Sequence, residues 1–424
     1  MRIAAALLLF ICSLSASSQT DFERYFTKKI LRFDFMLAGN AERTTVYPLA
    51  FKEEPFWAGP SEKLTDHFGY GNFRYEVFDA VENRLIFSRG FSSLYQEWQT
   101  TAEAKKMERS FYEVATMPFP LRKIRFVLSV RDRNGSFSKL YETFIDPSDY
   151  FIRKEKPVAA ASSKVHDAGE PGKCVDIAFI AEGYTKDEMD KFRSDVRKMA
   201  ETLFSVAPFS DYRDKINIWA VEAVSLESGT DIPGEQIYIN TALNSSFYTF
   251  DLDRYLTTQD IKAVNDYAAV VPHDNIVVLI NSPRYGGGGV YNYYSGTTVD
   301  NPLSPKVFIH ELGHGFAGLA DEYYTSEVTY EEFYPLDVEP WEPNITTMVN
   351  FDSKWKTHID PGTPVPTPPE DKYAETTGLF EGGGYSVKGI YRSQTDCLMK
   401  GYTSNKFCRV CQKAIREMIE FYTR

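Results

Sequence analysis

Two histidines four residues apart constrain this chain more than any other feature of its sequence. Residues 310–314 read His-Glu-Leu-Gly-His, with apolar residues on both sides, which predicts a buried helix. On a helix, positions i and i+4 share one face, so His310 and His314 can bind one zinc ion. Glu311 projects beside that face, where its carboxylate can act as the general base toward a zinc-activated water. The motif therefore predicts two metal ligands and one catalytic residue.

A third protein ligand would complete a catalytic zinc site and leave the fourth position for water. Gly318 lies four residues after His314, and glycine at the end of a helix lets the chain turn sharply. Asp321 follows three residues later, so we predict that it is the third ligand. Its neighbour Glu322 is the alternative, because a different turn would bring that carboxylate to the metal.

The segment around this motif resembles a known family. Residues 310–323, His-Glu-Leu-Gly-His-Gly-Phe-Ala-Gly-Leu-Ala-Asp-Glu-Tyr, resemble the zinc motif of the IgA-type metallopeptidases, peptidase family M64. Residues 281–287 and 396–399 extend the resemblance over most of residues 174–424. Compared with the longer metzincin motif, one residue is inserted before the glycine. The resemblance implies a metzincin-like fold around the zinc, endopeptidase activity, and a protein or peptide substrate.

The resemblance also points to residues near the C-terminus. Metzincin-like folds place a methionine in a tight turn beneath the metal, and residues 397–401, Cys-Leu-Met-Lys-Gly, are similar to that segment. Met399 is therefore predicted to be the apolar floor of the histidine ligands, with Met348 as the weaker alternative. Tyr402 is a candidate catalytic residue that would donate its hydroxyl to the oxyanion. The alternatives for that role are Tyr323 and Tyr324.

The hydrophobic pattern divides the chain into two domains. Residues 19–155 hold short aromatic and β-branched runs between turn residues, which predicts an antiparallel β-sandwich. Residues 156–173 are rich in Pro, Gly, Ala and Ser, which predicts a linker. Strand and helix patterns alternate in residues 174–424, which predicts an α/β zinc-peptidase domain. The expected fold class is α+β multidomain.

The first residues have the composition of a secretory signal peptide. A basic residue precedes an apolar run over residues 3–11, and small residues follow it, so we expect cleavage after residue 18. This predicts a secreted, periplasmic or cell-surface protein. A lipoprotein anchor at Cys12 is the alternative. No other apolar run is long enough for a transmembrane segment.

Four cysteines would remain after cleavage, and an even number in an exported protein favours disulfides. We predict a disulfide from Cys397 to Cys408 or Cys411, with Cys174 free to pair with the remaining one. Cys408 and Cys411 form a CxxC pattern, so half of a zinc knuckle or a redox pair is the alternative. No second CxxC accompanies it.

Charge and the motifs together define the predicted function. A net charge of −12 argues against nucleic acid and anionic lipid as partners. We predict a secreted endopeptidase with one zinc ion per chain. The alternatives are a glycan- or protein-binding protein with an inert or structural zinc domain, whose N-terminal domain binds a surface ligand, and an amidase that acts on cell-wall peptides. The four glycines at 286–289 predict either a flexible turn or close approach of an extended substrate to an edge strand.

Overall fold

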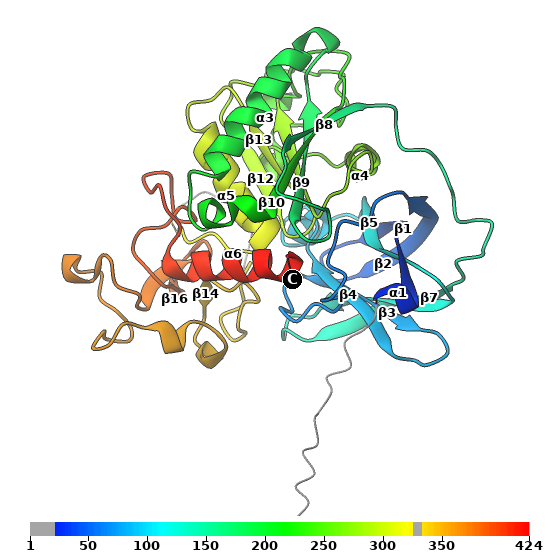
Figure 1. Cartoon of the computed structure of the whole chain (residues 1–424). Helices are drawn as coiled ribbons and strands as arrows, with labels where there is room; N and C mark the ends of the chain where they lie inside the picture. Colours follow the sequence, from blue (N-terminus) through cyan, green and yellow to red (C-terminus); the bar gives the residue numbers. More distant parts are fainter. Residues whose placement is uncertain (1–21, 325–332, 424) are drawn as a thin grey trace, which may run out of the picture.

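A computed structural model describes residues 22–324 and 333–423. The predicted signal peptide and Cys12 lie outside these residues. The described chain combines several β-sheets with helices, in agreement with the predicted α+β class (Figure 1). Within the described residues, no helix is both long and apolar enough to cross a membrane.

Two antiparallel sheets form the N-terminal part of the chain. The first has the strand order β2-β1-β5, made of Thr44–Glu54, Phe26–Gly39 and Arg109–Pro120. The second has the order β4-β3-β6-β7, made of Leu85–Phe91, Phe73–Asp79, Ile124–Arg131 and Phe137–Ile145. Two short helices, α1 (Phe22–Tyr25) and α2 (Leu94–Gln99), accompany them. Alternate residues of β3 are buried, and the two sheets share one aromatic core that includes Phe33 and Phe126.

A six-stranded mixed sheet forms the centre of the second part. Its order is β12-β13-β11-β9-β10-β8, made of Gly287–Val290, Tyr294–Thr298, Asn275–Ile280, Val175–Glu182, Ile216–Glu222 and Ala161–His166. The four inner strands run parallel, and the edge strands β12 and β8 are antiparallel to their neighbours. Every residue of β9 and β11 is buried, as expected for strands covered on both faces.

The helices cover this sheet. α3 (Met189–Leu203) and α5 (Ser304–Ala317) contact each other as well as the sheet, and α5 packs on β12 and β13. α4 (Ile261–Ala268) lies between β9 and β5 of the N-terminal part, and α6 (Arg409–Tyr422) packs against α5 (Figure 1). A small sheet with the order β14-β16-β15 precedes α6 and consists of Ile345–Thr346, Ser386–Arg392 and Phe380–Gly383.

One strand lies where the sequence predicts a linker. β8 falls within residues 156–173 and pairs with β10 at the edge of the central sheet. Three of its residues are exposed and the other three are only partly buried, so β8 carries no apolar alternation. An edge strand pairs with one neighbour through its backbone, and that pairing does not require apolar side chains. The predicted linker is therefore shorter than its composition suggests.

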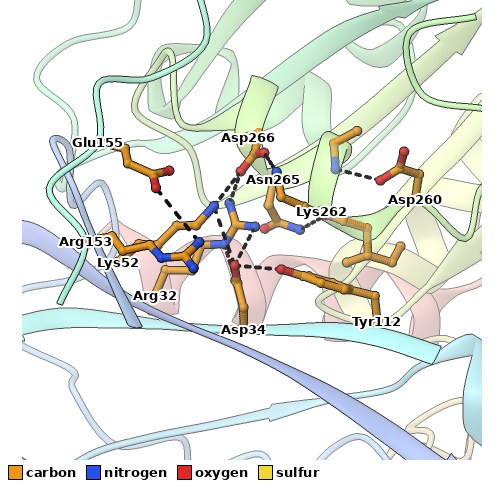
Figure 2. A network of polar contacts seen from close by, with 12 residues as sticks. Arg32, Asp34, Lys52, Tyr112, Arg153, Glu155, Asp260, Lys262, Asn265 and Asp266 are labelled. Atoms are coloured by element: carbon orange, nitrogen blue, oxygen red, sulfur yellow. Dashed lines mark hydrogen bonds and ion pairs between the residues drawn. The ribbon is translucent and has the colours of Figure 1, made fainter. Parts of the chain in front are cut away.

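A buried ionic network joins the two parts of the chain (Figure 2). The guanidinium of Arg32 on β1 is fully buried and donates to Asp34 at 2.5 Å and to Glu54 at 3.1 Å. It also donates to Asp266 of α4 at 2.8 Å, and Lys52 reaches the same carboxylate at 3.2 Å. Because buried charges require such partners, the network fixes the N-terminal sheets against the central domain.

Candidate metal centre and active-site cleft

Helix α5 carries the His-Glu-Leu-Gly-His motif and ends where the sequence predicts. Gly318 adopts a left-handed conformation with φ of +62°, and its N–H donates to the carbonyl of His314 at 3.0 Å. A Cβ atom at Gly318 would lie 2.8 Å from the ring of Trp341. Both the backbone conformation and the close approach require glycine. The chain turns there and returns Asp321 toward the helix.

Three ligand-type atoms meet beside α5. His310 Nε2 lies 3.1 Å from His314 Nε2, and Asp321 Oδ1 lies 3.0 Å and 3.3 Å from these two nitrogens. Ligands about 2.0 Å from a tetrahedral zinc ion are separated by about 3.3 Å. The spacing of the three atoms therefore matches one face of a zinc coordination tetrahedron.

The hydrogen bonds of the two histidines show that their facing nitrogens are free to accept a metal. His310 donates from Nδ1 to the carbonyl of Leu398 at 2.9 Å, and His314 donates from Nδ1 to the carbonyl of Leu319 at 2.6 Å. A neutral imidazole that carries its proton on Nδ1 presents a lone pair at Nε2. Two lone pairs and a buried carboxylate oxygen then face one another. These electron-rich atoms repel each other unless a cation binds between them. The residues fit a metal ion.

The electrostatics of the site lead to the same conclusion. Although burial opposes it, the carboxylate of Asp321 raises the pKa of His314 to about 9. Against its own burial, the pKa of Asp321 is held well below the usual range by His314 and His310. A positive charge between these groups is strongly favoured, and a divalent cation supplies it.

The two neighbouring acids of the turn face different surroundings. Asp321 Oδ2 accepts a hydrogen bond from the hydroxyl of Tyr385 at 2.5 Å, which orients the carboxylate toward the histidines. Glu322 points away from them and toward Asn344 and Cys411. Tyr385 lies between β15 and β16, far along the sequence, and no spacing pattern links it to the motif. Sequence analysis did not identify it.

Glu311 lies beside the three ligand-type atoms and faces the cleft. Burial raises the pKa of its carboxyl, although the two histidines oppose this. Strand β12 approaches the helix closely here, since a Cβ atom at Gly289 would lie 2.2 Å from the carbonyl oxygen of Glu311. The glycines at 287–289 therefore form the edge strand of the sheet rather than a flexible turn, and they allow that strand to contact α5.

Met399 lies beneath the helix in a tight turn. Its side chain is fully buried, and a Cβ atom at Gly313 would lie 2.8 Å from its sulfur. The preceding residue, Leu398, supplies the carbonyl that holds His310. The alternative, Met348, is 40% exposed and does not line the cleft.

The candidate tyrosines lie at different places around the site. The ring of Tyr402 is 5.6 Å from that of His310 and 6.1 Å from that of Tyr285, which sequence analysis did not identify. Tyr323 lines the cleft and interacts with Asp321. Tyr324 instead packs under the guanidinium of Arg392.

His310, His314 and Asp321 line a cleft of about 500 Å³, a volume typical of ligand-binding sites. Its walls come from both parts of the chain. The N-terminal part contributes Asn72, Ser92, Gln96 and Glu97. The sequence did not identify these residues, because chain segments so far apart carry no shared pattern. No finding supports a glycan ligand for this domain, whose described residues instead form one wall of the cleft.

The predicted disulfide is not found among the described cysteines. Cys174, Cys397, Cys408 and Cys411 are all free thiols. Cys397 Sγ lies 3.8 Å from Cys411 Sγ, well beyond the length of about 2.05 Å of a disulfide bond. The even number of cysteines suggested pairs, but the structure brings three of them together with Glu322 in one group.

Comparison with known families covers most of the chain. The model described as IgA Peptidase M64 matches residues 164–377 and 369–419, and the model described as Peptidase M64 N-terminus matches residues 21–142. A search of curated proteins returned no match.

Proposed function

The chain belongs to the IgA peptidase M64 family, which confirms the resemblance seen in its motif, and on that premise we propose that it is an exported zinc-dependent endopeptidase. Membership of a peptidase family indicates a protein or peptide substrate. The observation that carries the proposal is the meeting of His310 Nε2, His314 Nε2 and Asp321 Oδ1 beside Glu311 in the cleft. We assign the three as ligands of one zinc ion.

We assign the metal ion and the residues of the cleft different roles in peptide hydrolysis. When bound by His310, His314 and Asp321, zinc would supply a Lewis acid that polarises the scissile carbonyl and makes water a nucleophile near neutral pH. Glu311 takes the proton of the attacking water and passes it to the leaving amine. Its burial favours this exchange, because a carboxyl with a raised pKa accepts and returns a proton more readily. Tyr402 and Tyr285 both line the cleft, and we assign to a hydroxyl of this pair the donation of a hydrogen bond to the oxyanion.

Strand β12 provides a way to hold an extended peptide. It is the edge strand next to Glu311, and Gly287, Gly288 and Gly289 line the cleft. The carbonyl of Gly287 already accepts a hydrogen bond from the N–H of Leu256 at 3.3 Å, so a substrate can add to this edge as a further strand beyond Gly287, through backbone hydrogen bonds. The glycines let this strand lie directly against α5 beside Glu311, and residues of the N-terminal domain line the same cleft.

Two further features belong to the proposal. The motif helix, the glycine turn, the carboxylate and Met399 follow one another in the order of a metzincin-like domain, and the shared core of the two N-terminal sheets supports a β-sandwich. Export rests on the apolar residues 3–11 and the small residues after them.

The test compares the purified protein with Glu311→Gln and with Glu42→Gln, an exposed control that makes the same chemical change. Each protein is assayed for bound zinc and for cleavage of a peptide library by mass spectrometry. Zinc in all three proteins, internal cleavage by two of them and loss in Glu311→Gln would support the proposal. Equal cleavage by Glu311→Gln would refute the assigned base. Action only on cell-wall peptides would indicate an amidase, and absence of zinc would refute the metal site.

A further inference from the structure

A second group of metal-ligand side chains lies behind the wall of the cleft. It consists of Glu322, Cys397, Cys408 and Cys411, all of them buried. One ligand atom from each lies within 4.8 Å of all the others. None of the four lines the active-site cleft.

The distances in this group match a tetrahedral metal site. Sulfur atoms bound about 2.3 Å from a zinc ion are separated by about 3.8 Å. Cys397 Sγ and Cys411 Sγ are 3.8 Å apart. Glu322 Oε1 lies 3.2 Å from Cys411 Sγ and 3.7 Å from Cys408 Sγ. A disulfide between two of the three sulfurs would leave the third thiol facing a buried carboxylate.

The carboxylate of Glu322 gives an independent indication of a ligand. Its Oε1 accepts a hydrogen bond from Asn344 Nδ2 at 3.0 Å, whereas its buried Oε2 has no hydrogen-bond partner among the described residues. A fully buried carboxylate costs several kcal/mol unless a cation or several donors compensate it, and a thiol is only a weak donor. A metal ion in the middle of the group would supply that compensation.

Two of the three sulfurs, those of Cys397 and Cys408, accept hydrogen bonds as metal-bound thiolates do. The backbone N–H of Cys408 donates to Cys397 Sγ at 3.2 Å, and the N–H of Cys411 donates to Cys408 Sγ at 3.4 Å. Ser393 Oγ donates to Cys408 Sγ at 3.3 Å. Cys408 is the N-cap of α6, where the helix dipole favours negative charge. Hydrogen bonds of this kind orient metal-bound thiolates.

We propose that Glu322, Cys397, Cys408 and Cys411 bind a second zinc ion, with a structural role. Three thiolates and one carboxylate favour zinc over magnesium or calcium, which prefer oxygen ligands. Four protein ligands leave no position for water, so the site is structural and not catalytic. Arg392 and Lys400 interact electrostatically with Glu322 and offset part of the negative charge of the ligands.

The site would tie together three segments that form the catalytic centre. Glu322 directly follows Asp321, and its N–H donates to the carbonyl of Met399 at 2.8 Å. Cys397 directly precedes Leu398, whose carbonyl holds His310. Cys408 and Cys411 anchor the first turn of α6. The ion therefore takes the place of the predicted disulfide and pins the methionine turn to α6.

The first experiment uses the full chain, purified without reductant. Zinc is measured per chain, and thiols are counted after unfolding in the presence of a chelator. We expect two zinc ions per chain, and we expect Cys174, Cys397, Cys408 and Cys411 all to react as thiols. One zinc ion together with two thiols fewer would indicate a disulfide and overturn the proposal. One zinc ion with all four thiols reactive would overturn it as well.

Replacement of zinc by Co²⁺ separates the two sites. A cobalt–thiolate site shows charge-transfer absorption in the near ultraviolet, which the ligands His310, His314 and Asp321 cannot produce. We expect this absorption in the wild type and in His314→Ala, and its loss in Cys408→Ser. Cys174→Ser is the matched control and should keep both ions. Absence of the absorption from the wild type would overturn the proposal even if Cys408→Ser failed to fold, and it would leave the catalytic site untouched.

Discussion

The close approach of β12 to α5 leads to a prediction that can be worked out from the structure. A methyl group introduced by Gly289→Ala would lie 2.2 Å from the carbonyl oxygen of Glu311 and 2.9 Å from its carbonyl carbon. Because such atoms in contact are separated by more than about 3 Å, strand and helix would have to move apart by about 1 Å. A displacement of this size at a catalytic group costs about 100-fold in kcat/KM. Overpacking also lowers the free energy of unfolding by about 1–3 kcal/mol.

Gly296→Ala on the neighbouring strand is the matched control. A methyl group there would lie 3.5 Å from its nearest neighbour, Ile280 Cδ1, which is an ordinary contact. Cleavage of a quenched peptide substrate and urea denaturation would be measured for both variants. We expect Gly296→Ala to match the wild type in both assays. Wild-type turnover and stability in Gly289→Ala, or equal losses in the two variants, would refute the reasoning.

Three further predictions concern the candidate metal site and two buried charged groups of the N-terminal part. Tyr385→Phe removes the hydroxyl that orients Asp321, so zinc binding should weaken about 10–100-fold in competition with a chelator; unchanged affinity would contradict this. Arg32→Met removes the buried cation shared by Asp34, Glu54 and Asp266, and Lys52 remains near only Asp34 and Asp266. The variant should lower the free energy of urea unfolding by about 3–5 kcal/mol, against less than about 1 kcal/mol for the exposed Arg24→Met. Burial raises the pKa of Glu113 from 4.5 to about 8, so the folded protein keeps a proton that the unfolded chain releases. Glu113 should therefore make stability fall by about 1 kcal/mol per pH unit as pH rises across that interval, and Glu113→Gln should make the measured slope shallower by that amount; equal slopes in the two proteins would exclude this cause.

Sequence analysis succeeded where local patterns determine the structure. The spacing of His310 and His314 predicted a helix, and Gly318 predicted its end, because helical periodicity and left-handed backbone are properties of short segments. The buried strands β9 and β11 were recognisable as continuous apolar runs. The edge strand β8 was not, since backbone pairing alone holds it in the sheet.

The features that the sequence did not predict are contacts between segments that are far apart along the chain. Nothing local marks Tyr385 as a partner of Asp321, or Gln96 as part of the cleft. The ion pair between the buried Arg32 and the half-buried Asp266 likewise joins residues whose charges, in sequence, are typical of solvent-exposed positions. These roles depend on how the two parts of the chain pack, which residue spacing does not report.

The sequence offers both Asp321 and Glu322 as the third metal ligand, and the structure shows why residue spacing could not separate them. Both acids are buried, and the turn after Gly318 brings both into the interior. Their side chains leave the backbone in different directions, so one reaches the histidines and the other reaches the three cysteines. In our proposals each acid completes a different metal site, and the peptide bond between them joins the two sites. Loss of the ion held by Glu322 would then loosen Asp321 directly, which gives the structural site a physical means of controlling the affinity of the catalytic one.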